Sequence, residues 1–207
     1  MRIAVIAANG RLGKVFVELA LASGHDVRAG VRGVSDFAPH PNLEVIHCDA
    51  TSLSDLRILL EGQEVVVSAL GHIKGSPADV QTTATNAVVE VMNELNIKRF
   101  VDVTGTGIRF NGDKVTIADR FLNLAVTIID PTRVKDGQDH IKALEASSLD
   151  WTAIRVLKLQ NVKARTFELR LHGPTKLYVG RREVALAMLL VIEAKSFIKQ
   201  APIVSSK

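Results

Sequence analysis

The sequence predicts an α/β fold in which helices cover both faces of a doubly wound parallel sheet. Three observations support it. Short runs such as residues 3–6 and 64–68 are apolar and rich in β-branched residues, as in strands that are buried on both faces. Segments with helical spacing alternate with these strands, and no repeat or low-complexity stretch interrupts the series. The 207 residues, 47% of them hydrophobic, suffice for one domain with a sizeable core.

The first strand ends in a glycine-containing turn that leads directly into a helix. The first N–H groups of a helix lack intrahelical partners and the helix dipole favours an anion there, so a diphosphate fits this place. Gly10 lets a ligand approach the backbone, and Gly13 lets the helix pack against the strand. An ordinary strand-to-helix turn is the competing interpretation. The residues expected to contact a nucleotide here are Ala7, Asn9, Gly10, Arg11, Leu12 and Gly13.

The second strand, residues 27–31, has arginine rather than an acid at its carboxyl end. In a dinucleotide-binding fold of the Rossmann type, an acid near this tip binds the ribose 2′-OH of NAD, whereas an arginine suits the 2′-phosphate of NADP. No acidic residue occurs from the start of this strand until Asp36, beyond the tip. We therefore expect NADP, with NAD less favoured, Arg32 as principal ligand and Arg11 as helper. Arg28 points the same way but lies farther from the tip.

The remaining elements continue the alternation. Thr104 and Thr106 follow the fifth strand, and ligands of open parallel sheets bind beyond the carboxyl ends of strands. A threonine that bonds its own turn is the competing explanation. The other expected elements are strands at 43–47, 148–156 and 201–205, a strand with its glycine turn at 64–71, and a strand with its exit loop at 98–107. Helices are expected after a cap at Thr51 or Ser52, from Pro77 to Leu95, over 113–129 and 136–147, and after Val179.

Two segments resemble a known family. The turn is similar to the Gly-x-x-Gly-x-x-Gly motif of extended and atypical short-chain dehydrogenase/reductases, with Ala7 at the first glycine, a mild departure unless a positive φ is required. Residues 147–155, Ser-x-Leu-Asp-Trp-Thr-x-x-Arg, resemble the segment before the substrate region of NmrA-like and biliverdin-reductase-B-like members. Those proteins have proline where this chain has Val156, so the crevice wall there is expected to differ. The resemblance covers most of the chain.

The resemblance implies further site residues. It places the pair Asp49-Ala50, at the end of the third strand, near the adenine, although Asp49 equally suits a purely structural turn. It places the end of the fourth strand beside the cofactor ribose. It places His140 and Lys142 on the nicotinamide side and marks 157–180 as a substrate-side insertion in a single domain over 1–207. The residues implied at the two strand ends are Asp49, Ala50, Ala69, Leu70 and Gly71.

The chain lacks the Tyr-x-x-x-Lys dyad of typical members, because its one tyrosine, Tyr178, precedes Val-Gly-Arg-Arg. This disfavours alcohol dehydrogenase, epimerase and isomerase mechanisms that need an internal acid and base. One hypothesis is an NADPH-dependent oxidoreductase that transfers hydride to a small planar acceptor, such as a flavin, quinone or conjugated carbonyl. Thr106, His140 and Lys142 are its candidate catalytic residues. The other is a catalytically silent NADP-binding redox sensor of the NmrA type.

Composition excludes several other classes. The single Cys48 forms no internal disulfide and offers no cysteine-rich metal site, which suits a cytoplasmic protein. The net charge of +4 comes from scattered residues, so nucleic acid is not an expected partner. A strand begins at once, which leaves no room for a signal peptide, and the longest apolar run, 184–192, is too short to span a bilayer.

Overall fold

A computed structural model gives the fold of the chain and describes residues 1–105, 110, 124, 127–128, 130–162, 165–172 and 178–206. The strands are β1 (Arg2–Ile6), β2 (Asp26–Val31), β3 (Leu43–His47), β4 (Val65–Ser68), β5 (Arg99–Gly105), β6 (Asp150–Val156), β7 (Lys158–Gln160), β8 (Phe167–Arg170), β9 (Tyr178–Gly180) and β10 (Ile203–Ser206). The described helices are α1 (Arg11–Ala22), α2 (Leu53–Leu60), α3 (Val80–Glu94), α5 (Pro131–Ala146) and α6 (Arg181–Glu193).

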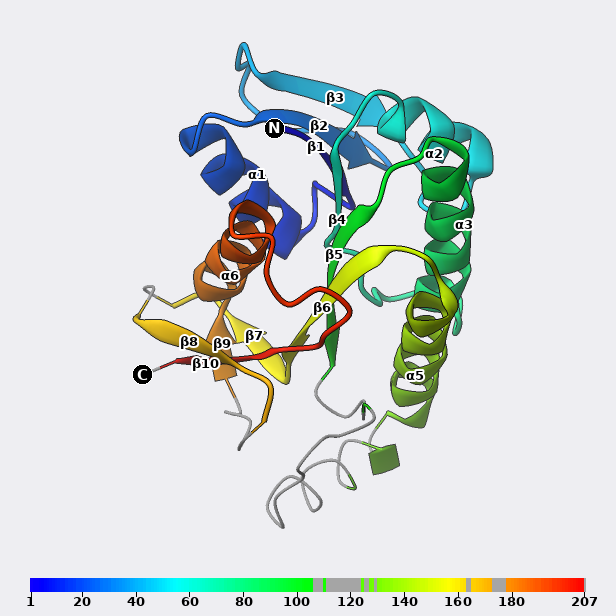
Figure 1. Ribbon diagram of the computed structural model, residues 1–207, viewed down its shortest axis with the longest axis vertical. Coiled ribbons are helices and arrows are strands. Elements are labelled where there is room, and N and C mark those ends of the chain that lie inside the picture. Colours follow the sequence, from blue (N-terminus) through cyan, green and yellow to red (C-terminus); the bar gives the residue numbers. More distant parts are fainter. Residues whose placement is uncertain are drawn as a thin grey trace.

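The main sheet has eight strands in the order β3-β2-β1-β4-β5-β6-β10-β8 (Figure 1). Its neighbours pair in parallel except β10 and β8, which are antiparallel. The strand order reverses direction between β1 and β4, and such a switch point opens a crevice beyond the carboxyl ends of the strands. The predicted α/β doubly wound sheet of Rossmann type is therefore confirmed. Strands β7 and β9 form a separate two-stranded parallel sheet.

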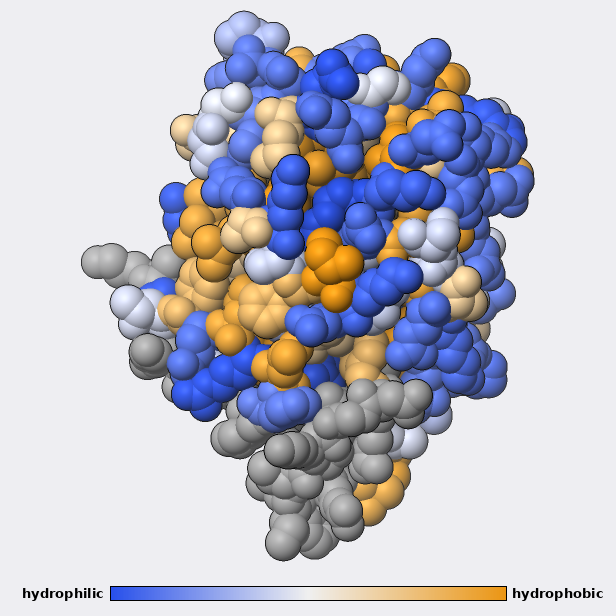
Figure 2. Space-filling view, viewed as in Figure 1, coloured by the Kyte–Doolittle hydropathy of each residue, from blue (hydrophilic) through white to orange (hydrophobic). Residues whose placement is uncertain are grey.

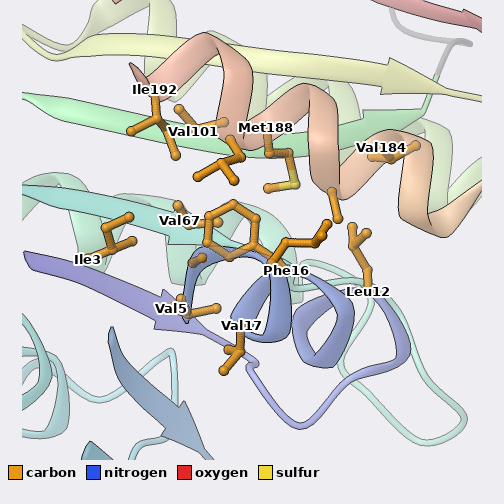
Figure 3. Packing of buried hydrophobic residues seen from close by; sticks show 14 of the residues in the cluster. Ile3, Val5, Leu12, Phe16, Val17, Val67, Val101, Val184, Met188 and Ile192 are labelled. Atoms are coloured by element: carbon orange, nitrogen blue, oxygen red, sulfur yellow. The ribbon is translucent and has the colours of Figure 1, made fainter. Parts of the chain in front are cut away.

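Helices cover both faces of the sheet, with α1 and α6 on one side and α2, α3 and α5 on the other (Figure 1). On the first side, the fully buried Phe16 of α1 lies among Val67, Val101 and Met188 (Figure 3). Apolar surface gathers over α6 and the segment that follows it, whereas hydrophilic residues dominate the α2, α3 and α5 side (Figure 2). In the described part of the chain, no helix is long and apolar enough to cross a membrane.

Two helices begin elsewhere than the sequence predicts. Helix α5 starts at Pro131, not near residue 136, because Asp130 accepts a hydrogen bond from the Arg133 N–H at 3.2 Å and proline suits the first helical position. Helix α3 starts at Val80, three residues after Pro77, where a carboxylate from α5 receives its first N–H groups. Most of the expected helix over 113–129 lies outside the described residues.

Candidate functional site

The turn after β1 holds the start of α1 close to the strand. The Gly10 N–H donates to the Ala7 carbonyl at 2.9 Å, and the Ala8 N–H donates to the Gly30 carbonyl of β2 at 3.0 Å. A Cβ added at Gly13 would lie 2.5 Å from the Ala7 oxygen and 2.6 Å from the Ala8 oxygen, where no side chain fits. Only glycine therefore permits this approach of helix to strand.

The N-terminus of α1 is open to an anion. Gly10 is its N-cap and provides no side-chain hydrogen bond, and the first turn contains no acidic residue. The N–H groups of Arg11, Leu12 and Gly13 therefore point out of the helix without an intrahelical acceptor. This arrangement fits a diphosphate, because backbone donors and the helix dipole act on the same ligand.

Ala7 occupies a backbone conformation that favours glycine. Its φ is +55°, in the left-handed region, so the alanine found in place of the motif's first glycine is not the mild departure that the sequence suggests. The left-handed conformation costs an L-residue about 1–2 kcal/mol. The surrounding hydrogen bonds of Ala8 and Gly10 hold this strained residue in place.

Arg32 lies at the carboxyl end of β2, with its guanidinium exposed. Within the described ranges, Arg32 forms no hydrogen bond or ion pair. The pKa of Asp49 is lowered mainly by hydrogen bonds from Thr51, and the charge of Arg32 lowers it further. Arg28, on the same strand, is committed elsewhere: it bonds Glu44 at 2.7 Å and the carbonyls that end α2. Of the two arginines, Arg32 is the one available to a ligand.

Two acids near Arg32 have structural partners. Asp49 accepts bonds from the N–H and hydroxyl of Thr51 at 2.9 and 2.7 Å, as a turn residue does. Asp36 is paired with Lys14 of α1 at 2.6 Å, and this bond lowers its pKa. Asp36 is thus held by α1. Ala50, beside Asp49, is buried.

The segment after β4, which contains Ala69, Leu70 and Gly71, is fastened to α5 through one carboxylate. Asp136 bonds the Nε2 of His72 at 2.8 Å and accepts the N–H groups of Gln81 and Thr82 at 2.9 Å each. Burial raises the pKa of Asp136, but the hydrogen bond from the Thr82 hydroxyl, together with those from the two N–H groups and His72, outweighs burial and leaves the pKa below its ordinary value. Asp136 therefore connects helix α5 both to the segment after β4 and to the start of α3.

A second carboxylate–histidine pair lies under the end of β5. Asp102 and His140 are 4% and 1% exposed, and their side chains meet at 2.6 Å. Burial opposes protonation of His140, but the Asp102 carboxylate outweighs it and raises the pKa of the imidazole. Thr104, two residues along the same face of β5, is also buried, and its hydroxyl has no hydrogen-bond partner in the described part of the chain.

The structure does not bring all the predicted catalytic residues together. Lys142 is exposed on α5 and bonds Asp139 at 2.8 Å, whereas His140 on the same helix is buried against β5. Thr106 lies outside the described residues. His140 is bound to Asp102 and is enclosed, so its position suits support of the strand end rather than direct contact with a substrate.

Sequence reasoning missed Asp102, Asp136 and His72. A signal existed for Asp102, because a carboxylate between two valines of a buried strand requires a partner. For Asp136 and His72 the sequence offered none, because their pairing joins positions 64 residues apart.

The chain is similar to known NAD(P)H-binding proteins. Residues 7–195 match the family model for NAD(P)H-binding proteins. An uncharacterized chloroplastic protein of Arabidopsis thaliana is 26% identical over 173 residues, which make up 77% of this chain and 60% of that protein. The chain thus spans less than two thirds of that relative's length.

Several solved structures share the fold. The oxidoreductase ylbE of Lactococcus lactis superposes with a TM-score of 0.81 at 15% identity, over 100% of this chain and 91% of that one. ChuY, an anaerobilin reductase of Escherichia coli O157:H7, gives 0.79 at 19% identity, over 100% and 97%. A short-chain dehydrogenase/reductase of Veillonella parvula, solved with NADP, gives 0.79 at 18%, over 99% and 94%. These structures share the fold of this chain, and the family match over residues 7–195 shows that the chain belongs to the NAD(P)H-binding family.

Proposed function

We propose that this chain is an NADPH-dependent oxidoreductase that transfers hydride to a small planar acceptor, such as a flavin, quinone or conjugated carbonyl. The observation that carries the proposal is the pairing of an uncapped α1 N-terminus with the uncommitted guanidinium of Arg32. The first fits a diphosphate and the second fits a 2′-phosphate, so both anionic groups of NADPH have a complementary donor.

Binding and orientation are the tasks of the chain's own residues. The N–H groups at the start of α1 bind the diphosphate, and Arg32 binds the 2′-phosphate beside Asp49. The segment from Ala69 to Gly71, held by Asp136 through His72, borders the ribose. Thr104 orients a polar group at the end of β5. The bound reduced nicotinamide supplies the hydride.

The choice of acceptor follows from the residues available for proton transfer. Tyr178, the one tyrosine, lies half exposed on β9 beside Lys158, whose Nζ is 5.4 Å from the ring centroid. Its place in the sequence does not form the Tyr-x-x-x-Lys dyad. Reduction of a flavin or a conjugated acceptor can take its proton from solvent, so it needs no strong internal acid. Ketones and sugars do need one.

The direct test is NADPH consumption by the purified protein with a panel of flavins, quinones and enones. Turnover with at least one planar acceptor, and none with simple ketones, is expected. Tight NADPH binding with no turnover across the panel would overturn the oxidoreductase proposal and favour the NADP-binding redox sensor. A cytoplasmic location is part of the same proposal, and fractionation of the source cells tests it.

Arg32→Ala tests the coenzyme preference. Loss of a charge-assisted contact to the 2′-phosphate should weaken NADPH binding about 10- to 100-fold. NADH, which lacks that phosphate, is the internal control and should bind with little change. Equal losses for both coenzymes, measured by quenching of protein fluorescence, would refute the role of Arg32.

A further inference from the structure

The N-termini of α1 and α6 lie side by side. Gly10 and Gly180 are their N-caps, so Arg11 and Arg181 are the first residues of two neighbouring helices. Leu12 points from α1 toward α6, on the side where Val184 lies (Figure 3). The start of α6 therefore lies next to the turn that is proposed to receive the diphosphate.

Arg181 is buried without a negative partner among the described residues. Only 8% of it is exposed, and its Nη1 donates to the neutral amide oxygen of Asn161 at 2.6 Å. The buried Glu183, two residues away, accepts the backbone N–H groups of Arg165 and Gly180 at 2.9 and 3.2 Å. Two arginines thus share this corner, and neither Arg181 nor Arg11 forms an ion pair within the described ranges.

Such an arrangement is unfavourable in the protein alone. Burial lowers the pKa of Arg181, and the charge of Arg11 lowers it further, so the two guanidinium groups repel each other. A buried cation is normally offset by an anion, because desolvation is costly. The geometry indicates that the compensating negative charge comes from a ligand.

We infer that Arg181 and Arg11 together bind the diphosphate of the nucleotide, Arg181 from the α6 side and Arg11 from the α1 side. This inference rests on the proposed nucleotide site and adds a second helix to it. Two guanidinium groups match the two negative charges of a diphosphate, and each presents a planar fork of donors to phosphate oxygens. Arg11 then serves the diphosphate rather than the 2′-phosphate, which is left to Arg32.

The inference also links nucleotide binding to the substrate side. Asn161, which holds Arg181, follows β7, and Gly180 ends β9, the partner strand of β7. A diphosphate bound by Arg181 therefore holds the carboxyl ends of β7 and β9 through Asn161 and the start of α6. These two strands border the substrate side of the site, so the coenzyme itself would position this part of it.

Arg181→Met, with Arg182→Met as matched control, tests this inference. Arg182 is the adjacent residue of the same helix and is exposed. By titration calorimetry, Arg181→Met should weaken NADPH and NADH by a similar factor, about 10- to 100-fold, because both contain the diphosphate. Adenosine 2′-monophosphate, which has no diphosphate, should bind as to the wild type. Arg182→Met should leave all three affinities unchanged.

The thermal stability of the ligand-free variant separates binding from a structural role. Removal of an uncompensated buried charge should leave the melting temperature of Arg181→Met equal or higher, whereas loss of a structural arginine would lower it. Arg11→Met, at an exposed position, provides a second test that does not threaten folding and should also weaken both coenzymes equally. Unchanged coenzyme affinity in both variants, or an equal loss for adenosine 2′-monophosphate, would overturn the inference. If the wild type binds neither coenzyme, the proposed function itself fails.

Discussion

Gly13→Ala is the sharpest perturbation of the nucleotide site. Its new methyl group would lie 2.5 Å from the Ala7 oxygen, about 0.9 Å inside ordinary van der Waals contact, and its nearest neighbours are all backbone atoms of Ala7 and Ala8. Helix α1 must therefore move away from the end of β1. Overpacking of this kind costs about 1–3 kcal/mol, which corresponds to a fall in melting temperature of about 2–12 °C for a domain of this size.

The same displacement should remove coenzyme binding. A shift approaching 0.9 Å stretches a hydrogen bond of normal length beyond useful range, and each bond to a charged oxygen contributes about 1.5–3 kcal/mol. With two such bonds lost, the affinity for NADPH should fall at least about 100-fold in titration calorimetry. Gly33→Ala is the control, because no described atom lies within 4 Å of its added Cβ. If Gly13→Ala bound NADPH as tightly as the wild type, the turn would not be the diphosphate site.

Three further predictions concern the buried polar groups. Asp136→Asn should lower the free energy of unfolding at neutral pH by about 1–3 kcal/mol. Because the wild-type pKa is depressed, this extra stability is present above about pH 4 and is lost as pH falls through the pKa of Asp136, so the variant should show a weaker acid dependence in urea titrations. Asp139→Asn is the control and should change stability little, because Asp139 pairs with the exposed Lys135 and Lys142 and solvent screens such pairs. In the wild type, the raised pKa of His140 adds to the free energy of unfolding below about pH 6.5, and this stability is lost as pH rises through that pKa. His140→Gln should abolish this loss of stability with rising pH. If the variant lost the same stability as pH rises, the Asp102–His140 ion pair would be contradicted. Arg99→Met should lower the free energy of unfolding by about 2–4 kcal/mol in chemical denaturation, because its half-buried guanidinium donates to four oxygens of β6, α6 and the segment after α6. Burial lowers the pKa of this group to about 10. A loss below about 0.5 kcal/mol would contradict that role.

The doubly wound fold class and the glycine turn could be predicted from the sequence because both depend on local patterns. Apolar runs of strand length, separated by segments of helical spacing, specify a doubly wound sheet with few alternatives. The tight approach at Gly13 follows from the absence of a Cβ, which the sequence shows directly. The positive φ of Ala7 could not be predicted, because it results from the surrounding turn rather than from alanine itself.

The polar interior could not be predicted because its pairs are distant in sequence. Asp136 receives the start of α3 and His72 across more than 50 residues, and this contact also decides where α3 begins. The sequence favours Arg32 over Arg28 only by its place nearer the tip of the strand. The position of α2 shows that Arg28 is used to end that helix. Long-range packing therefore determined which charged residues remain available to a ligand.

A crystal structure of the protein with NADP tests the central claim most directly. The diphosphate should lie at the N–H groups of Arg11, Leu12 and Gly13, with the 2′-phosphate in contact with the guanidinium of Arg32. Electron density for the nucleotide away from the start of α1, or a 2′-phosphate that Arg32 does not reach, would contradict the account.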